Sequence, residues 1–497
     1  MSAATALGAE RAGAAPGAAD AGRMPRAAAG ALARLGERGM GATVLVAGIS
    51  SAFGVLLLSA TGYIAAWAGG ESALAGRTAT IVIGILSFLL IGVAVYVASI
   101  VTANTFATIV AGRTRQIALL RLIGASARSQ RHEVARQGAA VGAVGAVIGL
   151  VVGILAAALL LQWADAALGI STGYQVLQPV LLLPAAVVCL TTWAGAWSGS
   201  RRVLSVTPLE AIAGAAPRTH EDVRGSKGRS IAALVLSVAG AALLAGGVAL
   251  GLVDPIGVVV AFFGGILSFT GLSLGAVVVM PPLLRLTGRM FGRSATARLA
   301  AENALRHPER ASRMAIGIVM GVTLVLMFAV ANESVKTLLT TAAGGDVPPQ
   351  LSQIMDTFAA IMMGLVAVSA VIAAVGLVNL LSIGVVQRRR ELGLLRALGL
   401  TSGQVRRVVL LEAVHVTITS LAFGLVLGVL YGWVAAQSLL GSVALPPASS
   451  APTFVAPGIP WGPVAVVVVA TAVLTLVAAV VPTRLATRVT AVEALAE

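Results

Sequence analysis

Ten long apolar runs occupy most of the chain, and each is long enough to cross a lipid bilayer. A bilayer core of about 30 Å needs about 20 predominantly apolar residues in a helix. The runs are continuous rather than alternating, which predicts helices and not the strands of a barrel. With 58% hydrophobic and 11% charged residues, the sequence predicts an all-α integral membrane protein with about ten transmembrane helices. The expected spans lie near residues 41–67, 78–102, 138–162, 177–199, 230–252, 256–282, 314–332, 357–386, 408–438 and 462–482.

Basic residues are confined to alternate gaps between the expected spans. The chain has 34 Lys and Arg residues and a net charge of +15, which in a soluble protein would suggest nucleic-acid binding. Because positively charged loops tend to stay in the cytoplasm, we expect both termini and the basic gaps to be cytoplasmic, with no nucleic acid as a partner. All Lys and Arg except Arg77 and Lys336 lie in the two tails and in residues 103–137, 200–229, 283–313 and 387–407.

One segment of the chain occurs twice. Residues 113–124 (RTRQIALLRLIG) return as residues 388–399 (RRRELGLLRALG), at a shift of 388 − 113 = 275. Each copy lies between two apolar runs, which indicates a duplicated membrane module. Parallel repeats of this kind pack around a pseudo-two-fold axis along the membrane normal. We expect a disordered tail (1–22), a first four-helix module (23–217), a linker with a central two-helix hairpin (218–294) and a second four-helix module (295–497).

Each repeated segment predicts a short helix, a glycine corner and a second, capped helix. Gly399 occupies the position after the first helix, where glycine enters the left-handed region at low cost. Thr401 and Gln404 fit a capping box that restarts the helix, and the first copy repeats the plan with Gly124 and Ser126. The second copy also has an apolar stripe, formed by Leu392, Leu394, Leu395 and Leu398.

Two interpretations of these segments stay open at this stage. Their arginines can neutralise anionic headgroups, at about 1 kcal/mol each, or the segments can dock a cytoplasmic partner. Because the Leu-Leu-Arg-x-x-Gly core is retained in both copies, docking is the favoured interpretation. The same 275-residue shift relates Asn104 to Asn379, and we expect each to form a helix-to-helix hydrogen bond, worth roughly 1 kcal/mol.

These motifs resemble the signature of the FtsX-like permease family, the membrane subunits of type VII ABC transporters. The resemblance rests on residues 390–399, on the phrase at 300–310 before the seventh span, and on the closing Thr-x-x-Glu-Ala phrases at 207–211 and 490–494. The ten-span, two-module chain is similar to the long permeases of the bacitracin-detoxification and lantibiotic-immunity kind. The resemblance implies a multi-pass protein of the bacterial plasma membrane.

The resemblance also implies that the repeated segments are coupling helices seated on a separate cytoplasmic ABC ATPase, present in two copies. In this chain Gln116 stands where the family has an acidic residue, so one charged contact is absent from the first site. The implied ATPase-coupling residues are Arg113, Arg115, Gln116, Leu120, Arg121 and Gly124, then Arg388, Arg390, Glu391, Leu395, Arg396 and Gly399.

The sequence offers no chemistry of its own for driving transport. Residues 225–230 (GSKGRS) lack the spacing of a phosphate-binding loop and follow no expected strand. The four histidines are scattered without metal-ligand spacing, and no nucleophile-and-base set can be assembled. We therefore expect a non-enzymatic subunit without a cofactor or metal, with ATP and Mg²⁺ bound by the partner ATPase.

The expected function is export or extraction of a hydrophobic, lipid-like or peptide cargo, with the substrate-binding residues unassigned. One alternative is a signalling protein of the FtsX type that transmits force to an extracytoplasmic partner, such as a cell-wall hydrolase. The outer gaps near 68–77 and 334–356 are too short to fold alone, and the Pro-rich loop 439–461 is interpreted as a stiff connector, with a small lid or contact loop left open. A secondary transporter is the less favoured alternative, because its coupling ion needs an ionisable residue at mid-membrane depth, whereas Glu412 and His415 lie near the cytoplasmic end of a span.

Overall fold

The computed structural model describes the protein as a bundle of long helices. In the described part of the chain every regular element is helical, and seven helices are long and apolar enough to cross a membrane. This confirms the predicted all-α membrane fold. The described residues are 40–70, eight positions between 84 and 100, 124, 126–168, 173–200, 227–289, 294–306, 308–342, 394, 396–442 and 453–486.

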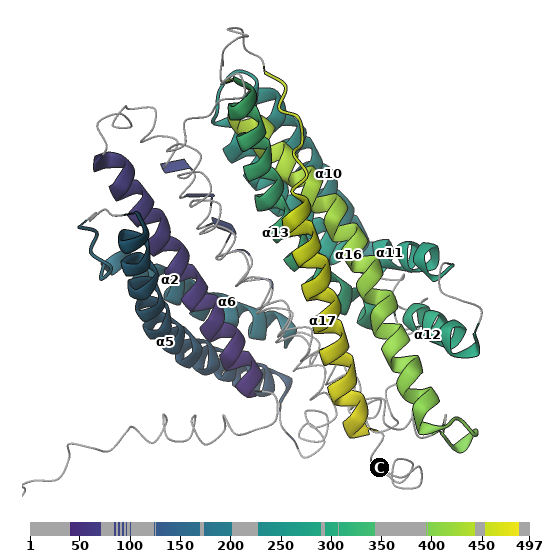
Figure 1. Cartoon of the computed structure of the whole chain (residues 1–497). Helices are drawn as coiled ribbons and strands as arrows, with labels where there is room; N and C mark the ends of the chain where they lie inside the picture. Colours follow the sequence, from purple (N-terminus) through teal and green to yellow (C-terminus); the bar gives the residue numbers. More distant parts are fainter. Residues whose placement is uncertain are drawn as a thin grey trace, which may run out of the picture.

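Three long helices of the first module form one group (Figure 1). Helix α5 (Ala127–Leu168) packs against both α2 (Met40–Gly70) and α6 (Leu182–Gly199), and the short 3-10 helix η1 (Pro179–Leu181) leads into α6. Tyr63 of α2 donates a hydrogen bond to Asp165 Oδ1 of α5 at 2.7 Å, which ties these two helices near their far ends.

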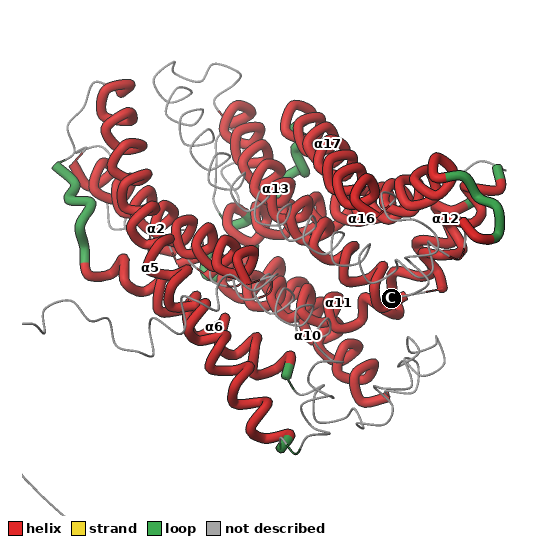
Figure 2. The backbone as a smooth tube through the Cα atoms, turned by 90° about the horizontal axis from the view of Figure 1, so that it is seen from below, coloured by secondary structure: helices red, strands yellow, loops and turns green. Residues whose placement is uncertain are grey.

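The second module and the central hairpin form the other group of helices (Figures 1 and 2). Helix α16 (Ser402–Leu440) packs against α13 (Pro308–Ala342) and α17 (Trp461–Ala486). The hairpin helices α10 (Lys227–Gly251) and α11 (Gly257–Gly288) pair with each other and both contact α16. The short helix α12 (Ala295–Arg306) packs against α16 and α11, burying Ala297, Ala300 and Ala304 on one face.

Glycines spaced four residues apart bring the main helix pair of each module close together. In the first module, a Cβ on Gly153 of α5 would lie 2.8 Å from the Val55 Cβ of α2. In the second module, a Cβ on Gly428 of α16 would lie 2.7 Å from the Leu326 Cβ of α13. These positions are related by the 275-residue shift (428 − 153 = 275), as are the preceding glycines at 149 and 424. The same small-residue helix contact has therefore been used twice.

The two groups of helices share one apolar core. It joins buried residues of α2, such as Phe53, to Val319 of α13, Val416 of α16, Met280 of α11 and Val467 of α17. The described positions of the second span also pack against the hairpin. Tyr96 lies 2.8 Å, oxygen to oxygen, from Thr270 of α11.

The helices match the expected spans in eight of the ten ranges, counted over the residues that the structure describes. The range 357–386 lies outside the described residues, and 78–102 is described only at scattered positions. The hairpin is split where Asp254 and Pro255 predicted it, and Asp254 Oδ1 accepts a hydrogen bond from Ile256 N at 2.8 Å. Helix α13 extends ten residues past the predicted end at 332, to Ala342. The predicted tail at 1–22 lies outside the described residues.

Candidate functional site

The second repeated segment ends in a sharp corner at Gly399. Leu398 N donates to Leu394 O at 2.9 Å and Gly399 N to Arg396 O at 3.1 Å, which closes the last turn of the short helix. Gly399 has a φ of +100°, in the left-handed half of backbone space that favours glycine. The predicted conformation of this glycine is confirmed.

A capping box restarts the helix directly after this corner. Gln404 N donates to Thr401 Oγ1 at 3.3 Å, and Thr401 N donates to Gln404 Oε1 at 2.8 Å. These two bonds satisfy backbone N–H groups that a helix start leaves without partners. The predicted capping box is confirmed, and α16 begins at Ser402.

The first repeated segment has the same corner. Gly124 has a φ of +102°, and Ser126 Oγ accepts a hydrogen bond from Ser129 N at 3.1 Å, in the manner of a helix cap. Helix α5 then begins at Ala127, which the 275-residue shift places on Ser402, the first residue of α16. We call the corner and its cap the elbow: residues 124 and 126–129 form the first elbow, and residues 394 and 396–404 the second.

Both elbow glycines are required by backbone conformation and not by lack of space. A Cβ added at Gly124 or Gly399 would meet no other atom within 4 Å, apart from immediate neighbours. Both glycines are exposed. The backbone conformation at each elbow glycine therefore depends on the positive φ alone.

Each elbow is continuous with a helix that reaches far beyond the thickness of a bilayer core. Helix α5 has 42 residues and α16 has 39, so at 1.5 Å per residue both are about 60 Å long. The base of α16 is fixed by Val405, Val408 and Val409, which are buried where α12 and α16 pack together. Each elbow is therefore joined to the membrane-spanning part by one continuous helix.

The second elbow presents apolar side chains on its surface. Leu394 is 53% exposed and Leu398 is 72% exposed, while Arg396 between them is half-buried. Exposed leucines beside a basic side chain are typical of a surface that contacts another protein. Of the predicted coupling residues, Gly124, Arg396 and Gly399 lie at the elbows.

The other predicted site residues lie outside the described part of the chain. They are Arg113, Arg115, Gln116, Leu120, Arg121, Arg388, Arg390, Glu391 and Leu395, together with the predicted helix-packing residues Asn104 and Asn379. Their roles stay predictions.

A polar cluster that sequence reasoning missed joins the hairpin to the second module. His415 Nε2 of α16 lies 2.9 Å from Leu284 O and 3.0 Å from Thr287 Oγ1, both on α11. Thr287 Oγ1 also lies 2.6 Å from Thr419 Oγ1. His415 is completely buried. The one sequence signal was the spacing of four residues between His415 and Thr419, which places both on one face of the helix.

The loop between α16 and α17, which the sequence predicts to be an outer loop, is held in place by a set of hydrogen bonds. Gln437 of α16 donates from Nε2 to Thr453 O at 2.9 Å and accepts from Val455 N at 2.8 Å. Trp433 Nε1 donates to Val455 O at 2.9 Å, and Gly458 N donates to Ser334 Oγ of α13 at 3.0 Å. We call residues 453–460 the outer strap. The outer strap is hydrogen-bonded to both α16 and α13. The interpretation of this loop as a stiff connector did not predict these bonds.

Comparison with known proteins gives one family match. The family model described as FtsX-like permease C-terminal matches residues 88–207 and 363–491, which together make up half of the chain. The two matches begin 363 − 88 = 275 residues apart, the same shift that relates the two elbows. Among curated proteins, none matches the sequence significantly.

Proposed function

From the premise that the chain belongs to the FtsX-like permease family, we propose that it is the membrane subunit of an ATP-driven export or extraction system, whose separate ATPase docks at the two elbows. The family identifies the chain as a multi-pass membrane permease component of an ABC-type system. FtsX-like permeases are generally associated with ABC ATPases. In this proposal the ATPase is present in two copies and carries ATP and Mg²⁺, and the chain itself is not an enzyme.

The observation that carries the proposal is the matched geometry of the two elbows. Both have an exposed glycine at a φ near +100°, a capped helix start two to three residues later and a long helix beyond it. Two equivalent surfaces at one fixed shift suit a partner that itself has two equivalent grooves. Leu394 and Leu398 supply apolar contact area at the second elbow, and Arg396 supplies the basic group.

ATP-driven closure of the paired ATPase would move the two elbows relative to each other. Because α5 packs tightly on α2 and α16 on α13 through their glycines, each module would move as a unit. A rigid-body rotation of one module against the other is a common form of such transitions. In the proposed orientation of the chain, the elbows and both termini lie on the cytoplasmic side of a bacterial plasma membrane.

The cargo that fits this chain best is hydrophobic, lipid-like or peptidic. The outward faces of α5 and α6 expose large apolar residues such as Leu155, Leu159 and Leu190, which is the surface expected against lipid. The core between the two helix groups is also apolar. A cargo that moves sideways from the bilayer, past α5 and α6 and between the two helix groups, would meet apolar side chains.

A second candidate function is force transmission to an extracytoplasmic partner. The outer strap exposes Phe454 (71%) and the next helix exposes Trp461 (74%), while hydrogen bonds from Trp433 and Gln437 fix the strap to α16. A fixed surface with exposed aromatic side chains is suited to contact with a partner protein. The same helix, α16, begins at the second elbow, so one rigid element would connect ATPase and partner. Secondary transport is less supported, because His415 is held by Leu284 and Thr287.

The test is to reverse the charge of two predicted coupling residues together, Arg121 before the first elbow and Arg396 in the second, with Arg121→Glu and Arg396→Glu. We expect the double variant to insert into the membrane normally and to lose co-purification of its ATPase. The control is the double variant Arg285→Glu with Arg298→Glu, which changes the net charge equally at exposed positions of α11 and α12. Undiminished co-purification by the elbow variant, or equal loss in the control, contradicts docking at the elbows.

A further inference from the structure

An arginine of the first module lies over the ring of a tryptophan that is itself stacked against a second tryptophan. The Arg131 Cζ of α5 is 3.7 Å from the ring centroid of Trp197 on α6. The Trp193 ring is stacked beside Trp197, with centroids 6.2 Å apart and an angle of 23° between the planes. His132 contacts the edge of the same ring, at 5.6 Å and 82°. A guanidinium over a tryptophan face is attracted by the ring quadrupole and is held in a fixed orientation.

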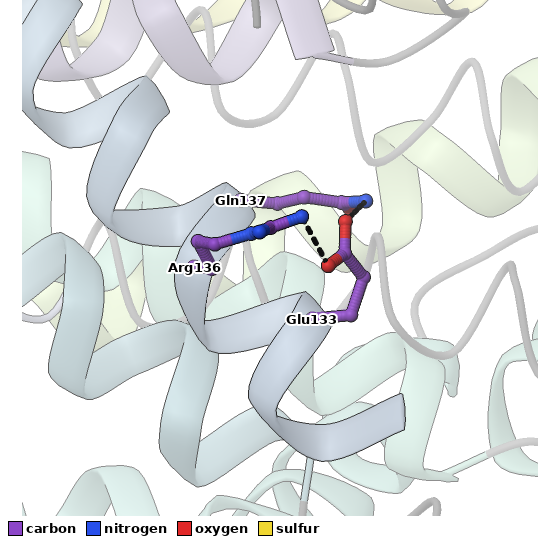
Figure 3. Close-up of polar contacts among 3 residues, drawn as sticks. All are labelled: Glu133, Arg136 and Gln137. Carbon is purple, nitrogen blue, oxygen red and sulfur yellow. Dashed lines mark hydrogen bonds and ion pairs between the residues drawn. The ribbon is translucent and has the colours of Figure 1, made fainter. Parts of the chain in front are cut away.

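The polar edge of this guanidinium has unused hydrogen-bonding capacity. Arg131 Nε is buried and has no hydrogen-bond partner among the described residues, so an external anion would have to bind the Nη groups at the end of this half-buried side chain. The carboxylate nearest in sequence, Glu133, binds Arg136 at 2.7 Å and Gln137 at 3.2 Å instead (Figure 3). Arginine is strongly suited to planar, two-point recognition of an anion. The local arrangement therefore presents a positively charged group that has no anionic partner among the neighbouring side chains that the structure describes.

The position of Arg131 along the helices corresponds to the level of lipid headgroups. The candidate membrane span of α6 ends at Trp197, and one turn before it Trp193 is 44% exposed. Tryptophans gather where the hydrocarbon meets the headgroups. Arg128 lies one turn before Arg131, inside the first elbow, and is exposed. An anion that approaches Arg131 along this face would come from the bilayer surface.

We propose that Arg131 and Arg128, with Trp193 and Trp197 beneath, bind the phosphate of an anionic phospholipid in the leaflet on the elbow side. Arg131 donates to the phosphate oxygens, and the exposed face of Trp193 packs against the upper part of the acyl chains. The site begins at Arg128, the second residue of α5. A bound lipid therefore tethers the first elbow to the membrane surface.

The second module lacks this site. The 275-residue shift places Arg406 on Arg131 (406 − 131 = 275), but the last helix of that module, α17, has its only tryptophan, Trp461, at its opposite end. The chain therefore contains its own matched control, a basic residue at the same repeat position without the aromatic floor.

The experiment is native mass spectrometry of the purified full chain titrated with phosphatidylglycerol. We expect tighter binding of phosphatidylglycerol than of phosphatidylcholine with the same acyl chains. Arg131→Gln should weaken phosphatidylglycerol binding by about tenfold or more, as loss of a charged hydrogen bond implies, whereas Arg406→Gln should leave it unchanged. Trp197→Phe removes the tryptophan whose fluorescence should respond to the lipid, so the fluorescence change on titration should shrink in that variant. Circular dichroism of each variant checks that its helices are retained.

Three outcomes overturn the proposal. Equal weakening by Arg131→Gln and Arg406→Gln indicates attraction to the net positive charge rather than a site. Unchanged binding in a folded Arg131→Gln variant shows that Arg131 does not hold the phosphate. Saturation of the site by inorganic phosphate alone indicates a soluble anion and not a lipid.

Discussion

Replacement of Gly399 by alanine should loosen the second elbow without disturbing the membrane-spanning part. At a φ of +100°, an L-residue pays roughly 1–2 kcal/mol for the left-handed conformation. A Cβ there would meet nothing within 4 Å, so no packing term adds to this conformational cost. The equilibrium constant for local unfolding of the elbow should therefore rise by about 5- to 30-fold. Asparagine tolerates positive φ better than alanine and should have a smaller effect.

The matched control lies four residues further on, at Gly403. This glycine is also exposed, but it lies inside α16, and a Cβ there would be 3.9 Å from Thr401 Oγ1, an ordinary contact. Gly403→Ala should therefore be neutral or stabilising by up to about 1 kcal/mol, since alanine is the better helix former. Substitution by alanine at these two exposed glycines of one elbow is therefore predicted to change its stability in opposite directions.

Hydrogen–deuterium exchange of the full chain measures this difference directly. The amides of Leu398 and Gly399 are bonded to Leu394 O and Arg396 O, and their exchange should accelerate in Gly399→Ala and not in Gly403→Ala. If the elbow is the docking surface, Gly399→Ala should also reduce co-purification of the ATPase. Unchanged exchange in Gly399→Ala, or equal acceleration in both variants, would refute the assignment of the corner to the positive φ.

Two further predictions concern helix packing, and detergent-titrated unfolding measures both. Gly149→Ala should destabilise the chain by about 1–3 kcal/mol, because the new Cβ would lie 2.6 Å from Ser51 Cβ. Its control is Gly246→Ala, which should not destabilise the chain because a Cβ there meets nothing within 4 Å. Equal unfolding midpoints for the two variants would argue against close packing of α2 and α5. Thr287→Val should lower the free energy of unfolding by about 1 kcal/mol, because it removes the hydroxyl that lies 2.6 Å from Thr419 Oγ1. Its control is Thr341→Val, at an exposed position. An unfolding midpoint of Thr287→Val no lower than that of the control would show that the cluster does not hold the hairpin.

The features that could be predicted from sequence are those set by local rules. The apolar runs located eight described helices because burial in a bilayer requires about 20 apolar residues per helix. Gly399 and Thr401 were predictable because a left-handed corner and a helix cap each favour few residue types. The end of α13 was not predictable from apolarity, since the helix continues beyond the apolar run through Glu333 to Ala342.

The features that could not be predicted depend on contacts between distant segments. The hairpin follows the first module in sequence and precedes the second, and no local pattern states which one it packs against. The hairpin contacts both: Thr287 lies against His415 of α16, 128 residues away, and Thr270 lies against Tyr96 of the second span. The contact of Arg131 with Trp197 similarly needs α5 and α6 to be placed side by side. The predicted coupling residues before each elbow stay untested by the fold.

The placement of the hairpin makes the two modules unequal. Helix α11 contacts the second span through Tyr96, and α10 and α11 both pack along α16, while α5, the counterpart of α16 in the duplication, packs chiefly with α2 and α6 among the described helices. If the two elbows are displaced equally, as the proposed function implies, α16 would have to move its contacts with the hairpin, whereas α5 would not. The first module would then move further than the second.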